Sequence, residues 1–318
     1  MRVLRLIAFA CALASTVTAA RAQVLAMGTS PQGTWTYSAG ATVAKVAGDE
    51  GLQMRVQPYG GTTTYVPLVN AGEIEFGLSG HLEVIYAVRG IEDFEGRKHG
   101  DIRVVAVLTP IQVALFVRAD SGIRAVRDLK GKRVPSDYGS QRIIQTLING
   151  ELANGGLEPG DVVGVPVPNV NRGADDFAAG RADAFYFALG SAKVAETNAK
   201  VAIRALPLDT APAAVAAMQA RVPVAYTMRV DPAPARAGVL EPIDILAYDY
   251  LVIAHAGAPD AAVERLARAL YGNRDALRAG FPPLAGFSPQ RMARDLGELA
   301  YHPGALKFYA EAGLRPRP

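Results

Sequence analysis

The feature that most constrains the fold is a regular alternation of short apolar segments with helix-like segments along nearly the whole chain. Strands are predicted at 24–27, 53–58, 74–79, 102–109, 112–118, 132–136, 162–167, 183–188 and 201–207. Helices are predicted at 35–48, 62–71, 81–89, 140–154, 171–179, 191–198, 211–220, 260–279 and 288–298. Such an order predicts an α/β fold with mainly parallel sheets.

Two of the predicted strands run into loops rich in small and hydroxyl residues, and each loop opens a helix. The first loop runs from Gly28 to Trp35, and the second reads Asp137-Tyr138-Gly139-Ser140-Gln141-Arg142. The first N–H groups of a helix lack intrahelical partners and lie at the positive end of its dipole, so both loops are candidate anion receptors. Two ordinary strand-to-helix turns, in which these residues only shape and cap the backbone, are the alternative.

The N-terminal residues 1–22 have the pattern of a secretory signal peptide. Arg2 and Arg5 precede an apolar run at 6–13, and Ala20-Arg21-Ala22 has the small residues of a cleavage site. A retained membrane anchor is the alternative, but the run is well short of the roughly 20 apolar residues that a spanning helix needs. We expect export across the inner membrane to the periplasm, with cleavage near Ala22.

Cleavage would change the composition of the chain. The predicted signal holds three arginines and no acidic residue, so its loss brings the formal charge of +3 to about zero. With no basic run, a nucleic-acid partner is not expected. Cys11, the only cysteine, would also leave, which excludes disulfides and thiolate sites. The four histidines lack the spacing of a metal motif, so neither a metal nor a cofactor is expected.

An internal similarity indicates two domains. Residues 69–76 and 178–185 both read as a helix end, a glycine and an acid that lead into a strand. Gly72 and Gly180 are 108 residues apart. About 296 mature residues are enough for two domains, although a chance likeness between two helix-to-strand junctions is the alternative.

Several segments together resemble one receptor family. They are Gly28-Thr29-Ser30 with Gly33-Thr34-Trp35, Gly60-Gly61-Thr62, the run 68–73, the run 128–134 with Gly139-Ser140, and the tail 302–309, which begins His302-Pro303-Gly304. The chain resembles the TAXI family, the extracytoplasmic receptors of tripartite ATP-independent (TRAP) transporters, within the type II periplasmic solute-binding proteins.

The resemblance implies two Rossmann-like lobes that are joined by a hinge and close on a solute. Crossover strands are then expected near 109–113 and 243–252, with lobe one at 23–110 plus 250–318 and lobe two at 111–249. The implied function is the capture of a small organic carboxylate, an organic acid or amino acid with or without an aromatic body. The receptor would deliver this solute to the membrane subunits of a TRAP transporter.

The candidate ligand-binding residues lie in and beside the two loops. Arg142 is the candidate for a bidentate pair with a carboxylate, and a solvated charge on a helix is its alternative. Aromatic side chains near the loops are candidates for stacking on the solute, although core packing is the alternative for each. The full set is Thr29, Ser30, Thr34, Trp35, Tyr37, Gly61, Thr62, Ser79, Tyr138, Gly139, Ser140, Gln141, Arg142 and Ser191.

Two other functions use the same fold, namely a secreted enzyme and a ligand-sensing coreceptor of a membrane kinase. An enzyme would need a nucleophile with a base, or paired carboxylates, in the cleft. The loops offer only Asp137, and His81 follows Ser79 without a third partner. The chain is therefore expected not to be an enzyme, whereas a sensing role would use the same binding chemistry as transport.

Overall fold

The computed structural model describes residues 24–315 of the chain. The predicted signal peptide, residues 1–22, lies outside the described residues. The strands are β1 (Leu25–Thr29), β2 (Met54–Pro58), β3 (Phe76–Gly80), β4 (Ile102–Arg118), β5 (Arg133–Ser136), β6 (Val163–Pro166), β7 (Ala184–Ala188), β8 (Ile203–Ala205), β9 (Tyr226–Val230) and β10 (Ile243–His255). The helices are α1 (Trp35–Asp49), α2 (Thr62–Asn70), α3 (His81–Arg89), α4 (Ile143–Asn154), α5 (Val170–Ala178), α6 (Ala192–Lys200), α7 (Pro212–Arg221), α8 (Asp260–Gly272), α9 (Arg274–Gly280) and α10 (Pro303–Glu311). Between residues 24 and 315, no helix combines the length and apolar character needed to cross a bilayer.

The strands form one large sheet and one small sheet, which confirms the predicted α/β class. The large sheet has the order β2-β1-β3-β10-β4-β7, while β8 pairs with β4 and β9 pairs with β10. The pairs β1 with β2, β1 with β3, and β5 with β6 are parallel. The long strands β4 and β10 run antiparallel to their neighbours.

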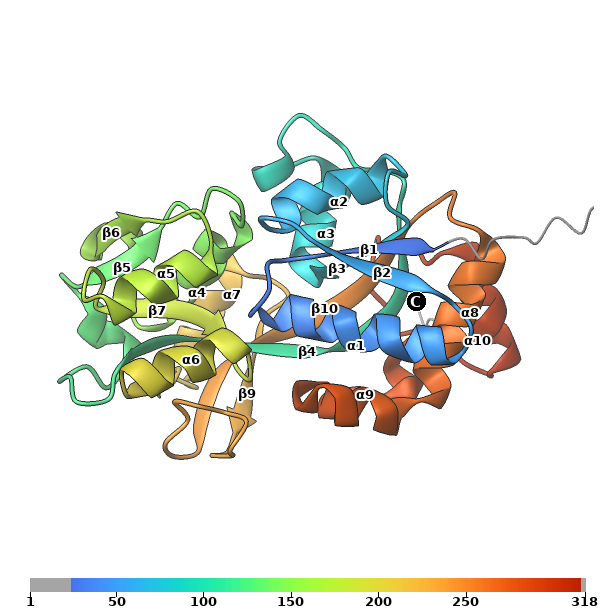
Figure 1. The fold of residues 1–318 in the computed structure, drawn as a ribbon. Helices are drawn as coiled ribbons and strands as arrows, with labels where there is room; N and C mark the ends of the chain where they lie inside the picture. Colours follow the sequence, from blue (N-terminus) through green and yellow to red (C-terminus); the bar gives the residue numbers. More distant parts are fainter. Residues whose placement is uncertain (1–23, 316–318) are drawn as a thin grey trace, which may run out of the picture.

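Strands β4 and β10 connect the two ends of the molecule (Figure 1). The elements β1 to β3, α1 to α3 and α8 to α10 gather around one end of this pair, and β5 to β7 with α4 to α6 gather around the other (Figure 1). The two strands pair from Ile102 opposite His255 to Val113 opposite Leu246, with one register shift after Tyr250 and another after Val252. Nearly every residue of both strands is buried, as expected for near-continuous apolar runs covered on both faces.

Some predicted elements differ from the structure. The strands predicted at 102–109 and 112–118 are one strand, because pairing with β10 continues through Pro110, which sits opposite Asp249. The helix predicted at 260–279 is interrupted at Asn273 and forms α8 and α9.

The prediction of a helix at 288–298 is wrong, because only a three-residue 3-10 turn forms in this segment, at Pro289–Arg291. Apolar side chains of this segment, such as Met292, are buried without helical backbone, and Val107 N–H donates to the Met292 carbonyl at 3.0 Å. Gly297 has a positive φ of 64°. The sequence pattern predicted neither β9 nor α10.

Candidate functional site

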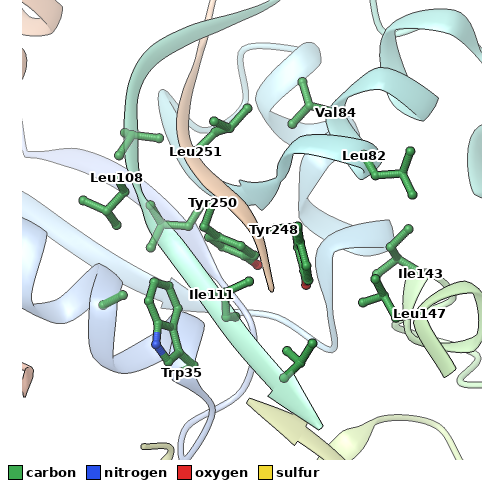
Figure 2. Packing of buried hydrophobic residues seen from close by; sticks show 14 of the residues in the cluster. Trp35, Leu82, Val84, Leu108, Ile111, Ile143, Leu147, Tyr248, Tyr250 and Leu251 are labelled. Atoms are coloured by element: carbon green, nitrogen blue, oxygen red, sulfur yellow. The ribbon is translucent and has the colours of Figure 1, made fainter. Parts of the chain in front are cut away.

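A cavity lies where the two ends of the molecule meet beside β4 and β10. Its volume, measured as room for the centres of water molecules, is about 50 Å³, enough for a few waters. Figure 2 places Tyr248 and Tyr250 of β10 between Trp35 and Ile143. The lining residues are Ser30, Thr34, Trp35, Thr36, Thr62, Glu83, Ile111, Val113, Gln141, Ile143, Ile144, Val170, Tyr186, Phe187, Ala188, Tyr248 and Tyr250.

The first loop brings hydroxyl groups and an indole to this cavity. Thr34 caps α1, because its Oγ1 accepts from the Tyr37 N–H at 3.2 Å and donates to the Pro31 carbonyl at 2.6 Å. Trp35 packs edge-on against Tyr250, with ring centroids 5.3 Å apart. The capping role predicted as the alternative therefore applies to Thr34, and Ser30 keeps a hydroxyl at the cavity wall.

The second loop is built differently from the prediction. Helix α4 begins at Ile143, three residues later than predicted, and Asp137 and Tyr138 have positive φ values of 67° and 40°. The N–H groups of Ser140 and Gln141 already donate to the carbonyls of Pro168 and Tyr138, at 2.9 and 2.8 Å. These two N–H groups are therefore not free for an anion in this structure.

Gln141 connects the two ends of the molecule across the cavity. Its side chain is buried, with Nε2 donating to Ser30 Oγ at 3.4 Å and Oε1 accepting from the Val170 N–H at 3.0 Å. Gly61 packs so tightly against the second loop that a methyl group there would overlap the Ser140 carbonyl oxygen. The two loops thus touch each other directly beside the cavity.

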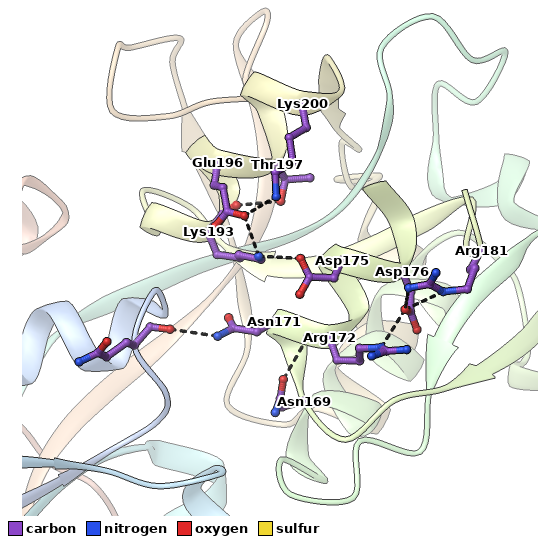
Figure 3. A network of polar contacts seen from close by, with 11 residues as sticks. Asn169, Asn171, Arg172, Asp175, Asp176, Arg181, Lys193, Glu196, Thr197 and Lys200 are labelled. Carbon is purple, nitrogen blue, oxygen red and sulfur yellow. Dashed lines mark hydrogen bonds and ion pairs between the residues drawn. The ribbon is translucent and has the colours of Figure 1, made fainter. Parts of the chain in front are cut away.

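Further contacts join the first loop to α5 and α6. Asn171 Nδ2 donates to the Gln32 carbonyl at 3.0 Å, and the Lys193 N–H donates to the Gly33 carbonyl at 3.1 Å. Figure 3 shows Asn171 reaching toward the first loop from the same surface that carries the ion pairs of Lys193. Lys193 Nζ pairs with Asp175 at 2.7 Å. The two ends of the molecule are therefore in contact around the cavity.

Glu83, on the first turn of α3, is the ionisable group that distinguishes the cavity. Its side chain is 2% exposed, and Oε2 accepts from Ser79 Oγ at 2.9 Å. Within the described part of the chain, Oε1 is buried and has no hydrogen-bond partner. Burial raises the pKa of Glu83 to about 7, although the Thr62 and Ser79 hydroxyls act in the opposite direction.

Tyrosine hydroxyls complete the polar part of the wall. The Tyr250 hydroxyl lies 3.1 Å from Thr36 Oγ1, and within residues 24–315 the Tyr186 hydroxyl has no partner. Burial raises the pKa of Tyr186 and of Tyr248 well above the usual value, so both phenols stay neutral and can donate. Among the described residues that line the cavity there is no lysine, arginine or histidine.

The structure distributes the predicted site residues over four settings. Ser30, Thr34, Trp35, Thr62 and Gln141 line the cavity. Thr29, Gly61, Ser79, Tyr138 and Ser191 are buried but are not among the lining residues. Tyr37 and Ser140 are half-buried, whereas Gly139 and Arg142 are exposed.

The sequence analysis missed the lining residues that β4, β7, α3 and β10 contribute. Glu83 could have been noticed in the sequence, because it is an acid in an otherwise apolar run. An acid in the first turn of a helix is, however, also explained by the helix dipole. The missed lining residues include Thr36, Glu83, Ile111, Tyr186, Tyr248 and Tyr250.

Solved structures share this architecture. The alkanesulfonate-binding protein SsuA from Xanthomonas axonopodis pv. citri, bound to MOPS, is 19% identical over 83% of this chain and 84% of its own, with a TM-score of 0.51. MatC from Rhodopseudomonas palustris, with bound malate, is 13% identical over 84% of this chain and 90% of its own, with a TM-score of 0.56. A further structure, described as a periplasmic transporter, is 16% identical over 80% and 85%, with a TM-score of 0.55. The chain therefore has the fold of the periplasmic solute-binding proteins.

The sequence places the chain more narrowly. The profile of the NMT1-like family matches residues 27–313, so the chain belongs to the NMT1-like family. The match spans both ends of the molecule and both cavity loops.

Proposed function

We propose that this protein is a periplasmic receptor that captures a small organic carboxylate and delivers it to a TRAP-type membrane transporter. The observation that carries the proposal is a cavity lined from both ends of the molecule, with Gln141 bonded across it to Ser30. Family membership and the fold support a solute-binding role. Residues 302–309, on which the TAXI resemblance partly rests, support the choice of transporter.

We further propose that residues 23–110 plus 250–318 and residues 111–249 act as two lobes that hinge at β4 and β10. A solute that touches both lobes stabilises the closed form, because those contacts exist together only when the lobes are shut. Closure is then the signal that the membrane partner detects. The direct contacts of Gly61 with the second loop fit a closed conformation.

The polar groups that line the cavity suit a small carboxylate that is bound by neutral hydrogen-bond donors. Hydroxyls of Ser30 and the tyrosines, with the Gln141 amide, can donate to a carboxylate without an ion pair. The faces of Trp35, Tyr248 and Tyr250 can contact an apolar or aromatic solute body. Arg142 lies outside this wall, and its pairing with the carboxylate stays a prediction.

A thermal-shift screen of the mature protein tests the proposal. The panel contains monocarboxylates, dicarboxylates, amino acids and aromatic acids, and we expect a few to raise the melting temperature because they bind the folded state only. The same mixtures are followed for product formation, which would indicate the enzyme alternative. No shift with any carboxylate, or turnover of one, would overturn the proposal.

A further inference from the structure

One carboxyl group supplies the negative charge that the cavity can carry near neutral pH. Glu83 is the acidic side chain among the described lining residues, and no basic side chain lines the wall with it. Its Oε2 is satisfied by Ser79, but Oε1 is left without a partner in the described part of the chain. A buried carboxyl oxygen without a donor is costly, so a ligand that supplies the donor gains from filling the cavity.

Among the described residues, none of the groups that act on Glu83 is a cation that could pair with it. Ser79 and Thr62 face it from β3 and α2, and Tyr248 and Tyr250 face it from β10. These neighbours are neutral hydroxyl groups, and the Gly80 N–H, which also lowers the pKa of Glu83, is neutral too.

One further acid acts on Glu83 from outside this group. Asp93 on the turn Glu92–Phe94 raises the pKa of Glu83, and burial raises the pKa of Asp93 itself to about 6. The positive charge that acts on Asp93 is that of Arg142, which is exposed and does not line the cavity. An opposite charge for Glu83 therefore has to come from the solute.

We propose that the solute carries an ammonium group beside its carboxylate, and that Glu83 binds this ammonium group through Oε1. This inference rests on the proposed function and narrows the carboxylate to an amino acid. An N–H bond to an ionised carboxylate is about twice as strong as a neutral one, and the pair is shielded from water here. The Tyr186 hydroxyl and the second amide N–H of Gln141 remain available for the solute carboxylate.

The direction of proton exchange on binding distinguishes a solute with an ammonium group from one without it. The pKa of about 7 leaves Glu83 partly protonated at neutral pH in the empty cavity. An ammonium group beside it favours the ionised form, so binding at pH 7 releases protons. A solute with only a carboxylate disfavours the ionised form, and its binding takes up protons instead.

Calorimetric titration with matched probes tests the inference. The amino acids are L-leucine, L-phenylalanine and L-glutamate, and their deaminated counterparts are 4-methylpentanoate, 3-phenylpropanoate and glutarate. Titrations at pH 7 in phosphate and in Tris, whose ionisation enthalpies differ, give the protons exchanged. We expect at least one amino acid to bind about tenfold or more tightly than its counterpart, with proton release.

Glu83→Gln keeps the size of the side chain and removes its charge. We expect this variant to lose about ten- to a hundredfold in affinity for the amino acid, to gain or keep affinity for the deaminated acid, and to lose the proton release. Glu151→Gln is the matched control, because Glu151 is an equally buried acid whose Oε2 accepts from the Leu115 N–H at 3.0 Å and which does not line the cavity. Its affinities should match those of the unaltered protein within about twofold.

The outcomes separate this inference from the proposed function. Binding of deaminated acids with proton uptake, or an amino-acid preference that survives Glu83→Gln, overturns the inference and leaves a carboxylate receptor. If neither series binds, both the inference and the proposed function fail.

Discussion

Replacing Gly61 by alanine tests lobe closure most directly. Gly61 precedes α2 with a φ of 169°, which is extended backbone that any residue adopts, so alanine causes no backbone strain by itself. The added methyl group would, however, overlap the Ser140 carbonyl oxygen and lie 2.9 Å from the Ser140 carbonyl carbon. A backbone group cannot move aside by rotating, so the two loops would have to separate.

The cost of this overlap falls on the closed conformation. Overpacking a tight contact by one methyl group typically costs about 1–3 kcal/mol. If the overlap destabilises only the closed form by this amount, solute affinity falls by roughly 5- to 150-fold. The free energy of unfolding of the open form is then unchanged. Calorimetric titration measures the affinity, and small-angle scattering should show that saturating solute compacts Gly61→Ala less than the unaltered protein.

Gly139→Ala is the control for this experiment. Gly139 lies in the opposing loop, and an added methyl group there meets no atom within 4 Å. We expect this variant to bind and to compact normally. Unchanged affinity in Gly61→Ala would refute the reasoning, and an equal loss in both variants would assign the effect to loop flexibility rather than to the contact.

Three further predictions concern stability and the site. Gly304→Ala should lower the free energy of unfolding by about 1–3 kcal/mol, measured by urea denaturation, because the methyl group would lie 3.0 Å from the Asp260 carbonyl carbon; an unchanged midpoint would contradict this. Burial raises the pKa of Glu151 to about 8 from 4.5, so the folded state keeps a proton that the unfolded chain has lost, and stability falls as the pH rises through this range. Glu151→Gln should remove about 1.4 kcal/mol per pH unit of that decline between pH 5 and 8, and equal slopes in both proteins would argue against it. Arg142→Ala should weaken carboxylate binding about ten- to a hundredfold in calorimetric titration if the predicted pair forms, whereas unchanged affinity makes Arg142 a surface charge.

The structure also gives a physical reason for the residues His302 and Gly304 in the tail. His302 is fully buried, and its Nδ1 accepts from the Gly304 N–H at 3.1 Å, which caps α10. Gly304 leaves room for the Asp260 backbone. The segment that contributed to the family resemblance therefore serves packing.

Local patterns in the sequence determined the class of fold and the place of the two loops. Alternating apolar strands and helices, such as β1 followed by α1, follow from nearest-neighbour preferences that a short window contains. The hydroxyl-rich loops are recognisable because glycine, serine and threonine cluster where a strand leads into a helix, although the same residues also serve as turns and caps. Five of the fourteen predicted site residues line the cavity.

Contacts between distant segments decided the rest. Pro110 reads as a strand break, but pairing with β10 carries β4 through it. Segment 288–298 has helical periodicity, but its apolar residues are buried around a 3-10 turn instead. Glu83 looks like an ordinary first-turn acid until β10 brings Tyr248 and Tyr250 over it and closes the cavity. The burial and the missing partner that give Glu83 its chemistry depend on residues more than 160 positions away, which no local pattern contains.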